Sequence, residues 1–423
     1  MRWKWFYQLR DYLKSSLWIV PLVAIPLELA AIRILQRLDS LLGWSFLGLG
    51  KTGAAAMLNA IVTATLSFVV FTFGSLLVAL QVASGQMTPR IIATILVRNN
   101  VVRYTAGLFV FTLLFAISTM NRIEDNVPQL VVFAAACLGI CCFAAFLFLI
   151  DYAARLLRPI SIVSLVGQAG LAVIQSVYPE PTLGPIRSDY QRHKPGSPNR
   201  ILQHHGLSEI ILAANLGELV AEAERAKGVI EFVPQIGDFI ATDEPLFKLY
   251  GGATSLDDAK LRSTVVFGPE RTMEQDPTFA YRIIVDIALK ALSPAINDPT
   301  TAVIALDQLH HLLRKAGNQN LRTDEIFDNS GQLRVIFRTP NWEDFVHLAF
   351  TEIRFCGAQN MQIARRLRAM IENLIQTLPK HRHAIYRANW RCSTVISKST
   401  SDIPRTSLSL VSAILKGSEG RPA

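Results

Sequence analysis

Apolar residues are concentrated in the first third of the chain, where four long apolar segments follow one another. A helix needs about 20 mostly apolar residues to cross the hydrocarbon core of a bilayer. The pattern therefore predicts four membrane-spanning helices, at about residues 18–35, 54–83, 104–119 and 130–150. We expect residues 1–158 to form a transmembrane region.

The pattern changes after the fourth apolar segment. Residues 159–200 begin as a helix that leaves the bilayer and continue as a linker rich in proline, glycine and charge. Residues 201–395 alternate between short strands and amphipathic helices, which predicts an α+β cytoplasmic domain with a small β-sandwich and a helical hairpin. Residues 396–423 are expected to form a mobile tail. The predicted fold class is mostly α, a four-helix transmembrane region followed by this α+β domain.

The second apolar segment carries most of its polar and small residues on one side. Its members follow one another at steps of three or four residues: Asn59, Thr63, Ser67, Val70, Gly74, Val78, Gln81 and Gly85. Such spacing places them on one stripe of a helix. Small and hydroxyl residues allow close packing between helices, whereas the same stripe repeated around a symmetric oligomer would line a water-filled path. Both interpretations stay open.

Glu28 is the one acidic residue inside a predicted span. An ionisable group at membrane depth is costly to bury, so it is a candidate functional residue. In the alternative interpretation, Glu28 pairs with Arg33 or extends towards the outer interface.

The tripeptide Asp-Pro-Thr occurs at residues 276–278 and again at residues 298–300, each time before an apolar run of helical period. Aspartate is a strong N-cap because its carboxylate accepts hydrogen bonds from the free amides of the first turn. Proline suits the first helical position, where no amide donor is needed. The repeat therefore predicts two helices joined by a short turn.

Charged residues on this hairpin form a candidate cytoplasmic site. Arg282 and Asp286 lie four residues apart on a helix that is otherwise apolar, and Asn297 stands beside the second cap. The candidate site consists of Asp276, Arg282, Asp286, Asn297 and Asp298. In the alternative interpretation, the aspartates are only helix caps and the charged residues face solvent.

Composition and charge agree with a membrane protein. The chain has 423 residues, of which 51% are hydrophobic and 18% charged, and its formal net charge is +9. Basic residues precede the first predicted span and lie between the second and third, as cytoplasmic segments do. We therefore expect both termini in the cytoplasm. No basic stretch is interleaved with aromatic residues, so we expect no nucleic-acid partner.

Motifs of enzymes and metal sites are missing from the sequence. The five cysteines form no Cys-x-x-Cys pair and show no zinc spacing. No serine elbow, phosphate loop or dinucleotide fingerprint is present either. We expect no enzyme activity, no metal and no cofactor.

Four phrases resemble the bacterial domain-of-unknown-function 2254 family of predicted membrane proteins: "LVALQVASGQMTPR", "GVIEFVPQIGDFI", "RTMEQDPTFAYRIIVDIALKALSPAINDPTTA" and "EIRFCGA". The similarity covers nearly the whole chain up to roughly residue 375, and its most specific element is residues 291–299. The chain departs from the family at Met87 and Thr88, where Phe and Ser are usual. The resemblance implies a multi-pass protein of the bacterial inner (plasma) membrane with a cytoplasmic domain.

Two functional hypotheses follow. In the first, the chain forms a homo-oligomeric channel-like or transport protein in the lipid bilayer, and its cytoplasmic domain is a vestibule or gate. In the second, the chain is a membrane-anchored sensor or scaffold that binds a ligand or partner through the cytoplasmic domain. The direction of the polar stripe separates them, because a stripe that packs inside one protomer removes the reason for a channel.

Overall fold

The computed structural model describes residues 16, 18–42, 48–86, 100–123, 127–156, 158–182, 196–321, 324–383 and 385. The chain divides into two compact units, Met1–Ile162 and Val163–Ala423. Most of the expected linker, the expected mobile tail, Met87 and Thr88 lie outside the described residues.

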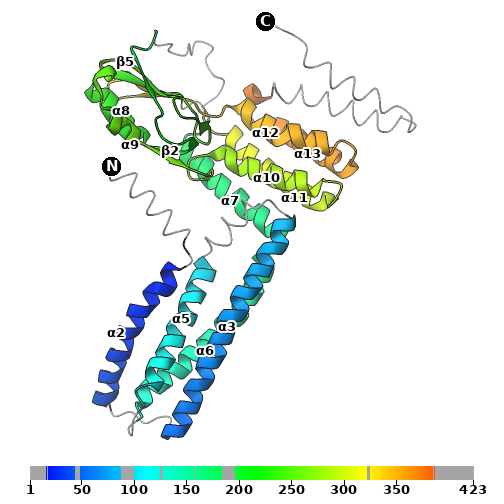
Figure 1. The fold of residues 1–423 in the computed structure, drawn as a ribbon. Coiled ribbons are helices and arrows are strands. Elements are labelled where there is room, and N and C mark those ends of the chain that lie inside the picture. The colour runs from blue at the N-terminus through cyan, green and yellow to red at the C-terminus, as the bar shows by residue number, and fades with distance from the viewer. Residues whose placement is uncertain are drawn as a thin grey trace. The chain divides into compact units, whose positions relative to one another are not determined.

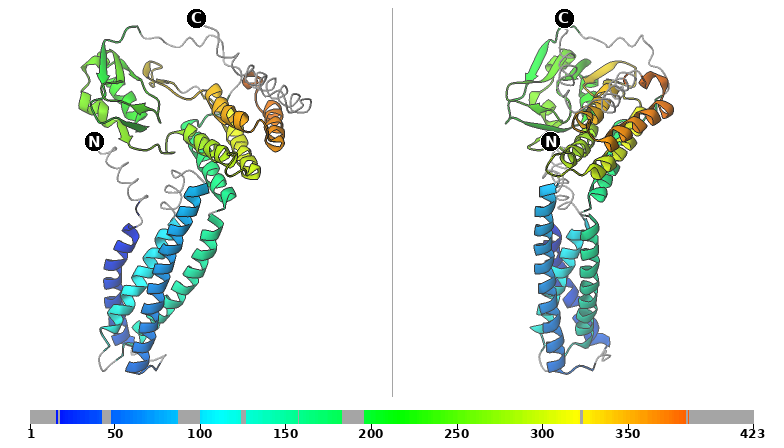
Figure 2. Two further views of the ribbon diagram at one scale, coloured as in Figure 1. Left: turned by 45° about the vertical axis from the view of Figure 1, so that its right-hand side comes forward. Right: turned by 90° about the vertical axis from the view of Figure 1, so that its right-hand side faces the viewer.

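The first unit is a bundle of long helices (Figures 1 and 2). Its members are α2 (Ile19–Leu42), α3 (Lys51–Gln86), α5 (Asn100–Met120) and α6 (Gln129–Leu156). All four are long and apolar enough to cross a membrane, and each overlaps one of the predicted spans. Hydrocarbon offers no hydrogen-bond partner to the backbone. A helix can cross it because its N–H and C=O groups bond to one another.

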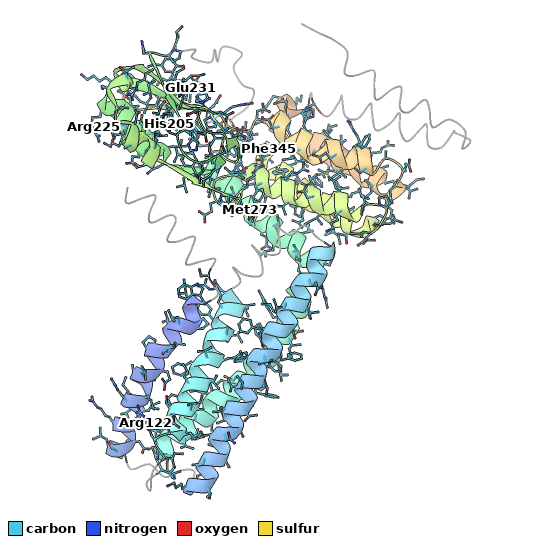
Figure 3. All side chains as sticks on the ribbon, viewed as in Figure 1. Arg122, His205, Arg225, Glu231, Met273 and Phe345 are labelled. Atoms are coloured by element: carbon cyan, nitrogen blue, oxygen red, sulfur yellow. The ribbon has the colours of Figure 1, made fainter. Side chains whose placement is uncertain are left out.

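The bundle is held by apolar side chains from all four helices. Near one end, fully buried Ile32 of α2, Leu58 of α3, Phe115 of α5 and Val132 of α6 belong to one cluster. Arg122, just beyond the end of α5, donates a 2.9 Å hydrogen bond to Gln36 Oε1 (Figure 3). Further along the bundle, Phe68 of α3 stacks on Phe146 of α6 with 4.5 Å between ring centroids.

A fifth helix, α7 (Pro159–Val177), is also long and apolar enough to cross a membrane. The prediction of four membrane helices is therefore corrected to five candidates. Most of α7, from Val163 onward, belongs to the second unit. A methyl group placed on Gly170 would lie 2.7 Å from Ala280 Cβ and 3.0 Å from Leu312 Cδ2. At this position α7 therefore packs closely against α10 and α11.

Substitution of Gly170 by leucine is expected to destabilise the protein, because the added side chain overlaps Ala280 and Leu312. Overpacking of a tight contact costs about 1–3 kcal/mol. Ala172→Leu is the control, since Ala172 is exposed on the same helix. Unfolding of the purified full-length protein, followed by circular dichroism, measures both. Equal stability of the two variants would contradict the packing of α7 described here.

The second unit contains two sheets. The strands are β1 (Arg200–Gln203), β2 (Glu209–Ala214), β3 (Gly228–Phe232), β4 (Phe239–Ile240), β5 (Pro245–Gly251), β6 (Val265–Gly268), β7 (Glu325–Phe327) and β8 (Leu333–Phe337). The larger sheet has the order β1-β5-β3-β8-β7 and the smaller one β4-β2-β6. In the larger sheet, β3 and β8 pair in parallel and place Ile230 opposite Val335.

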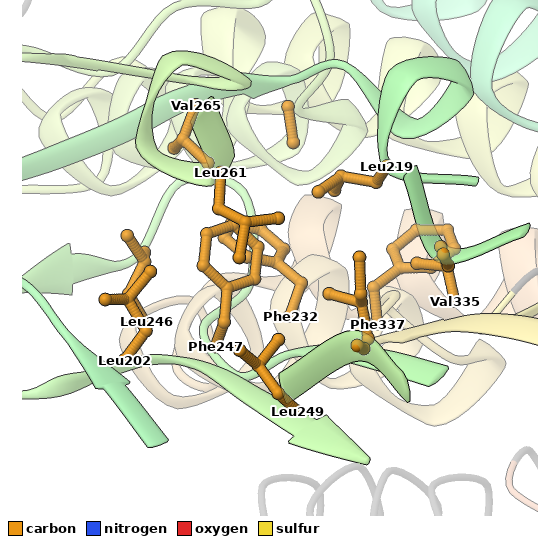
Figure 4. Close-up of a cluster of buried hydrophobic side chains, with 14 of the residues drawn as sticks. Leu202, Leu219, Phe232, Leu246, Phe247, Leu249, Leu261, Val265, Val335 and Phe337 are labelled. Carbon is orange, nitrogen blue, oxygen red and sulfur yellow. The ribbon is translucent and has the colours of Figure 1, made fainter. Parts of the chain in front are cut away.

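One apolar core lies between these sheets (Figure 4). Phe232, Phe247 and Val335 enter it from the larger sheet, and Ile211 and Val265 enter it from the smaller one. The helices α8 (Leu216–Arg225) and α9 (Asp258–Ser263) contribute Leu219 and Leu261 to the same core. The expectation of an α+β region is therefore confirmed.

Four longer helices of the second unit pack beside one another: α10 (Pro277–Ala291), α11 (Pro299–Gly317), α12 (Trp342–Cys356) and α13 (Met361–Thr377). Short 3₁₀ turns lie at Gly252–Ser255 and Lys380–Arg382. α10 and α11 form the predicted hairpin, and each begins at an Asp-Pro pair. Phe345 of α12 packs on Tyr281 of α10 with 5.1 Å between ring centroids (Figure 3).

Candidate functional site

The polar stripe of α3 faces away from the bundle. Asn59, Thr63, Ser67, Gly74 and Gln81 are all exposed. Val70 and Val78, the apolar members of the stripe, are 67% and 61% exposed. Gly85 lies in the last turn of α3. The chain therefore presents this stripe to its surroundings.

The opposite side of α3 holds the bundle together. Ala54 and Leu58 are fully buried, and Thr65 and Thr72 are 1% and 8% exposed. At about 100° per residue, this buried row lies about half a turn round the helix from the stripe. A dry contact of the stripe inside one protomer is thereby excluded.

The outward face of α3 has open space around Gly74. Nothing lies within 4 Å of a methyl group placed on Gly74, and a shallow hollow there is lined by Phe71, Gly74, Ser75 and Val78. Two helical turns earlier, the Ser67 hydroxyl donates a 2.8 Å hydrogen bond to the Thr63 carbonyl. Hydroxyls that bond their own backbone in this way are tolerated in hydrocarbon and in water alike.

Glu28 lies on the inner face of α2. Its residue is only 2% exposed, and its Oε1 atom accepts no hydrogen bond in the part of the chain that the structure describes. Arg33, the partner considered from the sequence, is exposed. Arg33 lies five residues after Glu28 and therefore points about 140° away from it round the helix. This explains why the two side chains do not meet.

In the second unit, Asp276 is a buried cap with its own counterion. Its Oδ1 accepts hydrogen bonds of 3.1 Å from the amides of Thr278 and Phe279. Its Oδ2 accepts from the Arg271 guanidinium at 2.5 and 2.8 Å. Burial raises the pKa of Asp276 above its usual range, and the neighbouring Arg271 opposes this rise. Gly237, with φ of 93°, passes close to this carboxylate and leaves no space for a side chain.

Asp298 caps α11 at a more exposed position. Its Oδ1 accepts a 3.1 Å hydrogen bond from the Thr301 amide, and its Oδ2 accepts one of 2.5 Å from the Thr301 hydroxyl. These bonds hold the pKa of Asp298 below its usual range. Asn297, directly before it, adopts a left-handed backbone with φ of 48°. Asparagine tolerates this conformation better than most residues do, so Asn297 serves the turn.

Arg282 and Asp286 form an ion pair of 2.8 Å on α10. Arg282 also binds Glu352 of α12 at 2.5 Å. The side chains of Arg282, Asp286 and Glu352 are 36%, 25% and 43% exposed, so the cluster is partly solvated. It joins two packed helices at their surface.

The structure does not bring the five predicted cytoplasmic residues together. α10 has 15 residues, so at about 1.5 Å per residue its ends lie about 22 Å apart. Asp276 is at one end of this helix, Asn297 and Asp298 follow the other end, and Arg282 and Asp286 lie between them. Each group has a structural role of its own, as caps, turn and surface ion pair.

Several partners were not found from the sequence. Arg271 and Glu352 complete the two ion pairs. Glu352 lies 70 residues from Arg282, so this pair leaves no local signal, whereas Arg271 lies only five residues before Asp276. A row of buried threonines was also missed, consisting of Thr65 and Thr72 on α3 and Thr105, Thr112 and Thr119 on α5. Their regular spacing of seven residues could have indicated it, because such spacing returns to the same helix face.

Metal binding gains no support from the geometry. Among the described residues, no group of three histidine, cysteine or acidic side chains could hold a metal ion.

Comparisons with known proteins identify the family. The model of a predicted membrane protein family, DUF2254, matches residues 14–373. The chain belongs to this family. Two relatives, the uncharacterized proteins Mb1321c of Mycobacterium bovis and Rv1290c of Mycobacterium tuberculosis, are each 25% identical to this DUF2254 protein over 402 residues. The similarity covers 89% of this chain and 75% of each relative. No solved structure matches.

Proposed function

We propose that this DUF2254 protein is a homo-oligomeric channel-like or transport protein in which α3 of each protomer faces the axis. The observation that carries the proposal is the outward direction of the polar stripe. Asn59, Thr63, Ser67 and Gln81 are exposed on the side opposite to the bundle core. A ring of such stripes gives a path with polar walls.

The energetics of the bilayer favour this arrangement over a stripe that faces lipid. Asn59 and Gln81 carry amide groups, which are costly to expose to hydrocarbon. Water in a path, or the same residues of another copy, removes this cost. Gly74, with open space around it, permits close approach of a neighbouring protomer.

The topology that fits the proposal has four membrane spans and both termini in the cytoplasm. An even number of spans returns the chain to the side from which it started. The packing of α7 against Ala280 and Leu312 supports its assignment to the extramembrane unit. The second unit then forms a cytoplasmic vestibule or gate.

Water access to the stripe tests the proposal. Ser67→Cys and Leu147→Cys are compared in a background in which the five native cysteines are replaced. Ser67 is exposed on the α3 stripe. Leu147 is 51% exposed on α6 and lies near the level of Ser67, because the neighbouring Phe146 stacks on Phe68 of α3. A charged, water-soluble thiol reagent is expected to modify the Ser67→Cys variant in the membrane and to leave the Leu147→Cys variant unmodified. Equal lack of reaction at both positions would contradict a water-lined stripe.

A second candidate is a membrane-anchored sensor or scaffold. The observation in its favour is the turn between α10 and α11, where Pro294, Ala295 and Ile296 are exposed. Binding of a partner at this turn would make the hairpin the functional element. Loss of a co-purifying partner after replacement of Ile296 by aspartate tests this candidate.

A further inference from the structure

We propose that Glu28 is a proton-binding site inside the bundle of each protomer. This proton site is independent of the proposed path, because Glu28 lies on the inner face of α2 whereas the stripe lies on the outer face of α3. Glu28 is only 2% exposed, and its Oε1 atom has no hydrogen-bond partner among the described residues.

The depth of Glu28 follows from the contacts between α2 and α5. A methyl group on Gly107 of α5 would meet Val20 of α2 at 2.6 Å, and Arg122 reaches Gln36. The residue numbers of these two contacting pairs differ by 87 and 86. α2 and α5 therefore run parallel with a constant register. Glu28 is therefore level with residues 114–115 of α5, about 8 Å before the end of that helix at Met120.

The buried polar groups described near this level are Thr112 and Cys142, which carry no positive charge. Thr112 of α5 and Cys142 of α6 are fully buried, and the Cys142 thiol donates a 3.1 Å hydrogen bond to Thr112 Oγ1. Thr112 lies within one helical turn of the level of Glu28. Hydroxyl and thiol groups can exchange hydrogen bonds with a neutral carboxyl, but they do not compensate a carboxylate as a cation does.

Neither Arg33 nor Arg122 is placed to form an ion pair with Glu28. Arg33 is exposed and turned away from Glu28. Arg122 binds Gln36, which is eight residues further along α2 than Glu28, and at about 1.5 Å per residue this separation is about 12 Å. An isolated carboxylate in hydrocarbon is far more costly than a neutral carboxyl. A bound proton removes this charge and leaves a neutral carboxyl group.

The buried threonines of α5 do not provide a partner for this carboxyl. Thr105, Thr112 and Thr119 are 8%, 0% and 1% exposed and follow one face of α5. This face lies about 140° round α5 from Gly107, which packs on α2. The Thr119 hydroxyl donates to the Phe115 carbonyl, and Thr112 accepts from Cys142. The ligand of the Glu28 site is therefore a proton.

Labelling of the full-length protein in liposomes with dicyclohexylcarbodiimide, located by mass spectrometry, tests this assignment. The reagent enters the bilayer and forms a stable adduct with protonated carboxyl groups. We expect an adduct at Glu28 at neutral pH, a decrease as pH rises, and complete loss in Glu28→Gln. Asp151, which is exposed near the end of α6 and pairs with Arg155, is the internal control and should stay unlabelled.

Two outcomes would overturn the assignment. Absence of an adduct at Glu28 in the wild-type protein would show that the carboxyl holds no proton at neutral pH. Protection from labelling by Na⁺ or K⁺ at constant pH would show a metal-cation site instead. Because the wild-type adduct is the primary result, the test stands even if Glu28→Gln fails to fold. Absence of labelling at Glu28 would not change the expected reactivity of Ser67→Cys. The proposed path would therefore still stand or fall by its own test.

Discussion

On the proposed function, substitution of Ser67 by tryptophan is expected to abolish the current through the α3 path in a planar bilayer. Ser67 is exposed at the middle of the α3 stripe, and an indole ring at this point on every protomer would fill a narrow path around the axis. The loss should be complete, to the background of a protein-free bilayer. Single-channel recording of the purified variant measures it.

Leu147→Trp is the control for this prediction. Leu147 is 51% exposed on α6, away from the α3 stripe. This variant should retain the wild-type current. Equal loss in both variants would point to general damage to the bundle, and equal retention would place the path elsewhere.

Removal of the Arg271 side chain is expected to cause the largest loss of stability. In Arg271→Met, the Asp276 carboxylate stays buried but loses its cation. Breaking a buried pair by removing one partner costs about 3–5 kcal/mol. The double variant Arg271→Met/Asp276→Asn should recover most of this loss, because asparagine is neutral and is still a good N-cap.

The effect of Arg271→Met should also depend on pH. Burial already raises the pKa of Asp276, and without Arg271 the rise is unopposed by a cation. The folded protein then binds this proton more tightly than the unfolded chain does, so stability falls as pH rises through the folded pKa. The loss in Arg271→Met is therefore larger at neutral than at mildly acidic pH, whereas the double variant lacks this dependence. Denaturant unfolding of the full-length variants at the two pH values measures it, and a pH-independent loss would contradict the account.

Features that depend on local chemistry could be predicted from the sequence. The caps of α10 and α11 follow from an aspartate beside a proline, and both are observed. The angular position of the α3 stripe follows from the helical period alone. Its direction does not, because the positions of α5 and α6 decide which face of α3 is covered.

Features that depend on tertiary contacts could not be predicted. An apolar run of 19 residues such as α7 has the length and hydropathy of a membrane span. At Gly170 it packs closely against α10 and α11, and length and hydropathy alone do not distinguish burial by helices from burial by lipid. The residues of the candidate cytoplasmic site are spread along α10 and its turn, where Asp286 and Asn297 lie at different places.

Electrical recording of the wild-type protein in planar bilayers, under applied voltage and membrane tension, tests the central claim most directly. The account predicts discrete current steps that are absent from bilayers without protein. A correctly assembled wild-type protein that stays silent under both stimuli would contradict the claim that the α3 stripes line a conducting path.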